Sequence, residues 1–316
     1  MASQLVALPE VERLSPACIR ILGGNPGKFT LQGTNTYLVG TGRERLLIDT
    51  GEGVAAWGDA LKRTLAEENA TLSATLITHW HPDHVGGIGQ VRQLVPGVPV
   101  CQSQIASGRT DYSSAVHGIS PSGAGGIEDI IDGQLFRVDG ATLRAVHTPG
   151  HTTDHMAFVL EEEGSLFAGD NVLGQGTAVF EDLAVYLQSL DRMRALYSVT
   201  KKGRLLYPGH GPVVEDGPAK ITEYIQHRQQ REDQVVRLLR SSDKEGASTT
   251  ADSVSTSSSP LAWTAMELVE VIYADVRKDL YPAAERGLIQ ILEKLEDEGK
   301  VVKEGRSWVL RERSPL

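Results

Sequence analysis

The sequence predicts an α/β fold, and three observations indicate it. Short apolar runs rich in β-branched residues recur up to about residue 210, and stretches with the apolar spacing of helices separate several of them. A polar turn carrying histidine or aspartate follows four of these runs. The chain has 316 residues, of which 40% are hydrophobic. That is enough for one large domain and a small one.

The composition argues against several classes of protein. The formal net charge is -10, whereas a general nucleic-acid binder carries an excess of basic residues. The two cysteines, Cys18 and Cys101, lie in unrelated contexts, so we expect neither a disulfide framework nor a cysteine-based zinc site. The first residues lack the features of a targeting signal, and no apolar stretch reaches the roughly 18 residues of a membrane span. We therefore expect a cytoplasmic protein without a membrane partner.

The first predicted elements are strands followed by a helix. Ile19–Leu22 and Thr36–Val39 are strand candidates on either side of a glycine-rich loop. The next strand, Arg45–Ile48, ends at Asp49. Asp49 has two interpretations of equal weight: it hydrogen-bonds a metal-bound histidine, or it caps the turn. A helix is expected over Ala55–Glu67, because its apolar residues have amphipathic spacing.

The densest group of metal-ligand side chains follows the apolar run Ala74–Thr78. It consists of His79, His81, Asp83 and His84, within six positions. At the end of a strand, the alternate residues His79 and His81 point into one cavity, and the following turn brings Asp83 and His84 to a neighbouring point. Imidazole and carboxylate are ligands that zinc and similar divalent metals accept. A polar loop with accidental histidines is the alternative, which so dense a cluster disfavours.

Three later strand ends carry one further candidate ligand each. The runs and their ligands are 142–146 with His151, 165–168 with Asp170, and 204–207 with His210. We expect the first metal to be bound by His79, His81 and His151, and the second by Asp83, His84 and His210, with Asp170 between them. His147 and His155 are expected to pack or to support ligands, and His117 to lie on the surface.

The C-terminal part predicts a small second module. Residues 221–240 have the pattern of a long polar helix, and the Ser/Thr-rich run 241–260 has the composition of a flexible linker. Two helical stretches and a hairpin follow, which suggest a winged-helix-like shape. Its basic residues alternate with acidic ones, so a packing role is favoured over nucleic-acid binding. The expected domains are 1–240 and 261–316, joined by 241–260.

The histidine and aspartate motifs at the four strand ends resemble, in order and type, the ligand set of the metallo-β-lactamase superfamily. The resemblance rests on His79-x-His81-x-Asp83-His84, Gly150-His151, Gly169-Asp170 and Pro208-Gly209-His210-Gly211. It implies an αββα sandwich with a dinuclear site where the loops of the two sheets meet. The position of Asp170 is a cysteine in the drug-hydrolysing lactamases, so the chain looks more like the other hydrolase branches. Zinc is the expected metal, with manganese or iron as alternatives.

A closer resemblance covers nearly the whole length. The segments 25–37, 176–183 and 207–212 look like the lactamase-beta-2-like group. That group includes animal endoribonucleases and the fungal thioesterases that release polyketides from an acyl carrier protein, atrochrysone carboxyl carrier-protein thioesterases among them. The resemblance implies a thioesterase acting on a carrier-bound polyketide. Asp83, besides binding the second metal, is the candidate catalytic residue that orients a metal-made hydroxide, and a purely ligating role for Asp83 is the alternative of equal weight. The alternatives are a single-strand endoribonuclease, a glyoxalase-II-like thioester hydrolase, and a module whose metals only stabilise the fold.

The charge and one loop favour the thioesterase. Few basic residues lie near the ligand turns; they are Lys28, Arg144 and Arg204. A nuclease would need several such residues to neutralise phosphates. The stretch from Gln102 to Asp129 is expected to be a flexible loop or lid. Its Ser/Gly/Ala-rich part, from Gln102 to Gly126, is expected to form a weakly polar wall over an extended aromatic acyl chain. The expected partner is therefore an acyl carrier protein, with nucleic acid disfavoured.

Overall fold

A computed structural model describes residues 5–104, 126–200, 203–241 and 262–311. His117, most of the loop expected over 102–129 and most of the expected linker 241–260 lie outside these ranges. The chain divides into two compact units, each described by itself. The first comprises residues 1–181 and 185–222, and the second comprises 182–184 and 223–316.

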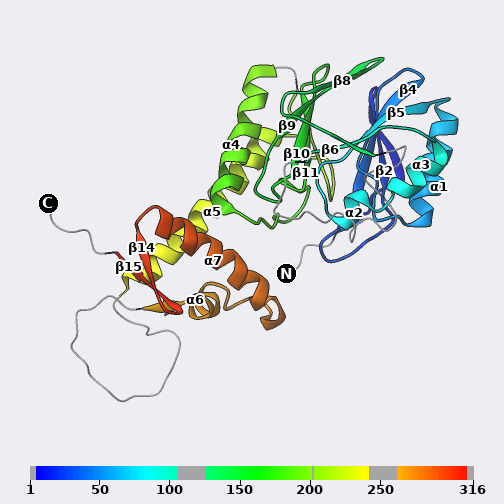
Figure 1. Cartoon of the computed structure of the whole chain (residues 1–316). Helices are drawn as coiled ribbons and strands as arrows, with labels where there is room; N and C mark the ends of the chain where they lie inside the picture. Colours follow the sequence, from blue (N-terminus) through cyan, green and yellow to red (C-terminus); the bar gives the residue numbers. More distant parts are fainter. Residues whose placement is uncertain (1–4, 105–125, 201–202, 242–261, 312–316) are drawn as a thin grey trace, which may run out of the picture. The chain divides into compact units, whose positions relative to one another are not determined.

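The first sheet of the first unit has seven strands, which pair in the order in which they occur in the chain (Figure 1). The first four pair antiparallel, and the pairs from β4 onward are parallel. The strands are β1 (Val11–Ser15), β2 (Cys18–Leu22), β3 (Asn35–Val39), β4 (Glu44–Ile48), β5 (Thr71–Leu76), β6 (Val100–Gln102) and β7 (Ile127–Asp129).

The second sheet has five strands in the order β12-β11-β10-β9-β8. Its pairs are antiparallel except for β11 and β12, which run parallel. The strands are β8 (Leu135–Val138), β9 (Ala141–His147), β10 (Met156–Leu160), β11 (Ser165–Gly169) and β12 (Leu206–Pro208).

Strand alternation divides the buried side chains of the first sheet between two cores. Leu46 and Ile48 of β4 belong to a core shared with Phe158 and Phe167 of the second sheet. Leu47, between them, belongs to a core on the opposite face, with Trp57 of the first helix. Because successive strand residues point to opposite faces, this pattern shows that the two sheets pack face to face while helices cover the outer face.

The helices complete an αββα sandwich (Figure 1). α1 (Ala55–Glu67) and α3 (Ile88–Leu94) contribute to the outer core of the first sheet. α4 (Leu183–Thr200) contacts the turns after β9 and β11, where the Ser189 hydroxyl donates to the Pro149 carbonyl at 2.6 Å and the Tyr186 hydroxyl donates to the Asn171 carbonyl at 2.6 Å. The short α2 (Pro82–Val85) follows β5, and α5 (Gly217–Arg240) begins in the first unit and continues into the second.

Side chains of β3 hold the turn after β12 in place. The Asn35 amide donates to the carbonyls of Pro208 and Gly211, both at 2.9 Å, and the Tyr37 hydroxyl donates to the Pro208 carbonyl at 2.6 Å. Asn35 and Tyr37 are both buried. These bonds join β3 of the first sheet to the end of β12 in the second, at the end where the candidate ligands follow their strands.

The second unit contains a small helical module with a three-stranded sheet. Its helices are α6 (Ala265–Ile272), the short 3-10 helix η1 (Lys278–Leu280) and α7 (Tyr281–Asp297), and its strands are β13 (Trp263–Thr264), β14 (Val301–Glu304) and β15 (Ser307–Leu310). Thr264 begins α6 with a capping box, in which its hydroxyl accepts from the Glu267 amide and the Glu267 carboxylate accepts from the Thr264 amide. Two helices followed by a hairpin form the winged-helix shape that the sequence predicts.

Candidate metal centre

The structure brings together all seven side chains that the sequence singles out as ligands. Each follows the carboxyl end of a strand: the first four follow β5, and the other three follow β9, β11 and β12. Their ligand atoms form two groups, within each of which all atoms lie within 4.8 Å of one another. The first group is His79, His81, His151 and Asp170, and the second is Asp83, His84 and His210.

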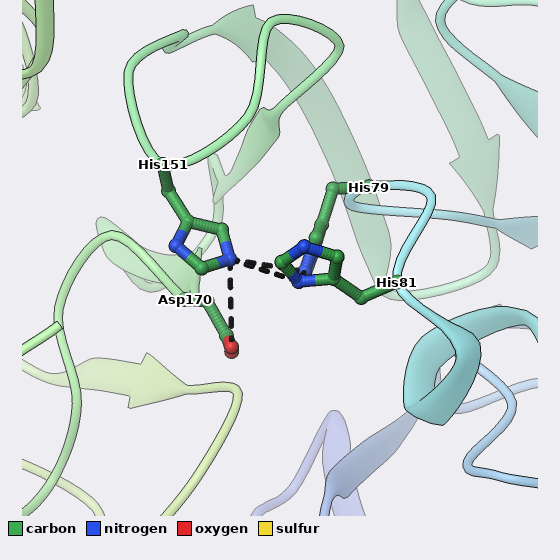
Figure 2. Close-up of side chains that lie close together, drawn as sticks. All are labelled: His79, His81, His151 and Asp170. Carbon is green, nitrogen blue, oxygen red and sulfur yellow. Dashed lines mark hydrogen bonds and ion pairs between the residues drawn. The ribbon is translucent and has the colours of Figure 1, made fainter. Parts of the chain in front are cut away.

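Three imidazole nitrogens of the first group converge on one point (Figure 2). His79 Nε2 lies 2.9 Å from His81 Nδ1, and His151 Nε2 lies 3.3 Å and 3.1 Å from these two atoms. Asp170 Oδ2 lies 3.8 Å from His151 Nε2. Ligand atoms at the corners of a tetrahedron around zinc, at its usual bond lengths, are about 3.3 Å apart. The spacing of the nitrogens therefore fits one ion.

The second group and Asp170 of the first surround a neighbouring point with two carboxylates and two imidazoles. His84 Nε2 lies 3.4 Å from both Asp83 Oδ2 and Asp170 Oδ1. His210 Nε2 lies 3.3 Å from Asp83 Oδ2 and 3.2 Å from Asp170 Oδ2. Asp170 thus contributes to both groups. Gly209 makes room for it, since a Cβ at that position would lie 2.2 Å from Asp170 Oδ1.

The protonation of the cluster favours a cation between these atoms. Burial lowers the pKa of His79 well below its ordinary value and lowers that of His81 to about 4, so both rings are neutral near pH 7. His151 Nδ1 donates to the Val179 carbonyl at 2.8 Å, which leaves its Nε2 as a bare lone pair. In the described part of the chain, the buried atoms His84 Nε2 and Asp170 Oδ1 make no hydrogen bond. Converging lone pairs and unbonded buried polar atoms fit divalent metal ions.

Carboxylates raise the pKa of the two imidazoles in the second group. Burial lowers the pKa of His210, but the Asp170 and Asp83 carboxylates together outweigh burial and raise it to about 9. Burial also lowers the pKa of His84, and Asp83, Asp49 and Asp170 together raise it well above its ordinary value. This second point therefore attracts positive charge strongly.

Asp49 lies directly behind His84. Its Oδ2 is 2.7 Å from His84 Nδ1, and its Oδ1 accepts from the Thr78 amide at 2.8 Å. Asp49 is 1% exposed and has the left-handed backbone angle φ 59°, which is uncommon outside glycine. The geometry is compatible with both interpretations of Asp49, because one carboxylate oxygen faces the imidazole and the other faces the turn.

Two contacts to the cluster could not be anticipated from the sequence. The Thr34 hydroxyl donates to Asp83 Oδ2 at 2.9 Å, and the Val179 carbonyl accepts from His151. The segments containing Thr34 and Val179 were singled out only for their resemblance to relatives. No local feature marks their contacts, since a threonine in a loop and a backbone carbonyl carry no ligand signature.

The two remaining histidines of this region support the turns. His155 is fully buried and lies with Nε2 3.2 Å from the Asp170 amide and Nδ1 2.9 Å from the Thr148 hydroxyl. Its ring therefore accepts from the Asp170 backbone and supports that turn, as expected. His147 ends β9, where its Nε2 lies 2.9 Å from the Thr153 carbonyl.

A cavity of about 370 Å³ opens onto the cluster. Five of the seven candidate ligands line it, and segments 28–31 and 175–179 form further walls. Among the lining residues that the structure describes, Lys28 is the one with a Lys or Arg side chain. A cavity of this size accepts a small molecule or one end of a larger one.

The sandwich and the cluster define an αββα protein with a candidate dinuclear metal centre. Residues 29–210 match the metallo-beta-lactamase superfamily, and residues 264–308 match the beta-lactamase associated winged helix domain. The chain therefore belongs to the metallo-beta-lactamase superfamily. The αββα fold and the winged-helix module predicted from the sequence are confirmed.

The chain is similar along most of its length to fungal proteins. It is 43% identical over 310 residues to the atrochrysone carboxyl ACP thioesterase of Aspergillus chevalieri, covering 98% of this chain and 90% of that protein. It is 42% identical to the lactamase-like protein aptB of Emericella nidulans, covering 98% and 92% of the two chains. A metallo-beta-lactamase family protein from Thermus thermophilus has a similar structure, with a TM-score of 0.69 and 25% identity, covering 95% and 100%. These relatives confirm the closer resemblance.

Within the described ranges, no helix combines the length and apolar character that a membrane span requires.

Proposed function

We propose that this protein is a metal-dependent thioesterase that hydrolyses the thioester between a polyketide chain and an acyl carrier protein. The observation that carries the proposal is a cavity ending at the seven-residue cluster, in a chain whose full-length relatives include an atrochrysone carboxyl ACP thioesterase. The two metals are proposed to be zinc, with manganese and iron as alternatives. The cytoplasmic location expected from the sequence stays a prediction.

The seven side chains are proposed to hold two divalent ions, three imidazoles at one point and Asp83, His84 and His210 at the other. Asp170 lies between them and would bind both. When bound, such ions lower the pKa of a coordinated water and polarise the carbonyl of a thioester. Asp49 is proposed to hold His84 in the tautomer whose Nε2 faces the second point.

Asp83 is the proposed catalytic residue. Its Oδ2 faces the second group and accepts from Thr34, and its other oxygen is available to accept a hydrogen bond from the attacking water. Burial opposes ionisation of Asp83, but His84 and His210 outweigh it and lower its pKa, so Asp83 is a carboxylate at neutral pH. Water adds to the acyl carbon, the C–S bond breaks, and a thiol and a carboxylic acid leave. A thiol has a pKa near about 8.5 and needs no strong general acid.

Ion pairing of the nearby basic residues supports a thioester substrate over RNA. Arg144 Nε lies 2.5 Å from a Glu161 oxygen, and Arg204 lies 2.6 Å from Asp216. Of the three basic residues considered from the sequence, Lys28 alone lines the cavity. An RNA substrate would need several free cations along its backbone.

The test offers the full-length protein a carrier-bound polyketide thioester and a single-stranded RNA at increasing salt. We expect release of the free polyketide acid without RNA cleavage, loss of turnover with a chelator, and recovery with Zn²⁺ or Mn²⁺. Asp170→Ala should lose turnover and bound metal together. Asp191→Ala, which removes an exposed carboxylate paired with Arg194, should keep both.

Two outcomes would overturn the proposal. Metal-dependent RNA cleavage with an inert thioester would identify a nuclease. Two bound metals with no turnover of either substrate would indicate that the metals only stabilise the fold.

A further inference from the structure

Two large apolar side chains at the cavity are unusually exposed. Phe29 and Val179 line it, yet they are 69% and 59% exposed. Single exposed apolar residues are ordinary. Here two such side chains come from separate loops around one cavity. A ligand bound in this cavity would cover apolar surface that both side chains now expose to water, which favours binding.

The loop that carries Phe29 is held by hydrogen bonds of its own. The Gly27 amide donates to the Leu31 carbonyl at 3.1 Å, and the Thr30 hydroxyl donates to the Asn25 carbonyl at 2.6 Å. Leu31 has a left-handed φ of 54°, a conformation that costs about 1–3 kcal/mol outside glycine. The exposed ring therefore belongs to a closed turn whose geometry the surroundings impose.

The loop that carries Val179 is joined to the candidate ligands. The Val179 carbonyl accepts from His151 Nδ1 at 2.8 Å, and the Gly174 amide at the start of the loop donates to the His210 carbonyl at 2.9 Å. This wall is therefore fixed relative to the two groups of ligand atoms. An acyl group resting on it would meet the reactive point in a defined position.

We propose that Phe29 and Val179 select an aromatic acyl group. Their side chains pack against it while its thioester carbonyl lies at the metal centre. The inference rests on the proposed thioesterase function and adds the part of the substrate that these residues recognise. A phenyl ring offers an offset-stacking partner to another ring. Lys28 Nζ, 5.5 Å from the centroid of the Phe29 ring, places a donor at the rim for oxygen substituents of that acyl group.

The test compares two thioesters that share one leaving group, the acetyl and the 2-hydroxybenzoyl thioesters of N-acetylcysteamine. In Phe29→Ala and in Val179→Ala, the ratio of kcat/KM for the aryl over the acetyl substrate should fall on the order of tenfold, as expected for a lost apolar contact in a pocket. Phe29→Tyr keeps a ring and should keep most of the ratio. Ile131→Ala, which truncates a side chain 64% exposed and absent from the cavity lining, should leave the ratio unchanged.

The possible outcomes distinguish the role of Phe29 and Val179 in substrate selectivity from the thioesterase activity itself. A ratio that stays unchanged in both truncations, with or without loss of overall rate, overturns the role of Phe29 and Val179 and leaves the thioesterase proposal standing. A wild-type protein that hydrolyses neither thioester nor a carrier-bound polyketide overturns both. Thermal unfolding should be unaltered in all four variants, because exposed side chains contribute little to stability.

Discussion

At the scale of single residues, the arrangement depends on a few hydrogen bonds that orient the ligand atoms. An imidazole can bind a metal only through a nitrogen without a proton, so its other nitrogen needs an acceptor. For His151 that acceptor is the Val179 carbonyl, and for His84 it is the Asp49 carboxylate. The orientation of these two candidate ligands therefore depends on residues outside the candidate ligand set.

Asp49→Asn separates the two interpretations of Asp49. Asparagine tolerates the left-handed backbone at this position, but it has one acceptor oxygen where His84 and the Thr78 amide each need one. If Asp49 orients His84, metal affinity should fall about 10–100-fold, as for other partners of metal ligands. Competition with a chelator of known affinity measures it.

If Asp49 only caps the turn, we expect a different result for Asp49→Asn. The free energy of unfolding of the metal-free protein would then fall, while metal affinity would stay at the wild-type value. Asp191→Asn serves as the matched control, since it makes the same change at an exposed carboxylate paired with Arg194.

At the scale of elements, the strand ends were predictable and the contacts between loops were not. Ligand-type side chains directly after β5, β9, β11 and β12 can be read locally, because each run of apolar residues shows where its strand stops. Thr34 meets Asp83 across 49 positions, and no pattern near Thr34 records this contact. The candidate ligands could thus be read from the sequence, and so could Asp49 as one of two interpretations, whereas the contacts of Thr34 and Val179 could not.

Helix α4 shows a second limit of the sequence. Its buried residues Leu183, Tyr186, Leu190, Met193 and Tyr197 recur at helical spacing, yet the helix is not among the predicted elements. Half-buried apolar residues on its other sides, namely Val185, Leu187 and Leu196, blur the amphipathic stripe on which such a prediction depends. Strand β10 was missed as well, although all five of its residues are apolar and buried, a pattern that is consistent with a buried strand.

The loop between β2 and β3 reaches the candidate catalytic residue through Thr34. Thr34→Val keeps the shape of the side chain but removes its hydrogen bond to Asp83. We expect kcat to fall about tenfold, with a smaller change in KM, because a misoriented catalytic group weakens the transition state more than substrate binding. Thr34→Ser retains the hydroxyl and should restore most of kcat. An equal loss in both variants would show that packing of the loop, and not the hydrogen bond, is what matters.

At the scale of the whole molecule, three basic residues of the winged-helix module, Lys294, Lys300 and Lys303, have partners within the second unit. Lys294 and Lys300 both pair with Glu232 and Glu298, and Lys303 Nζ lies 5.0 Å from the centroid of the Trp308 ring. Together with the net charge of -10, this pairing supports the interpretation of the module as a packing element. A nucleic-acid-binding module would present such side chains to phosphates.

The domain limits 1–240 and 261–316 remain a prediction, and α5 is the element that tests them. Residues 223–240 of this helix belong to the same compact unit as the winged-helix module. Within that unit Glu232 is 4% exposed, and its carboxylate lies 2.8 Å from Lys294 Nζ of α7 and 3.4 Å from Lys300 Nζ. Residues 223–240 of α5 should therefore unfold with the module.

Glu232→Ala should lower the free energy of unfolding of the module, because it removes the buried carboxylate that contacts Lys294 and Lys300. Loss of one member of a buried ion pair costs about 3–5 kcal/mol, and we expect about 2 kcal/mol here because Lys294 keeps Glu298 as a partner. Glu298→Ala removes the more exposed carboxylate from the same two lysines and should cost about 0.5 kcal/mol. Hydrogen exchange should report faster opening of α7 and of residues 223–240 in Glu232→Ala, with β9 to β11 and the bound metal unaffected. If β9 to β11 lose protection to the same extent, the two units unfold as one, and a separate C-terminal domain is ruled out.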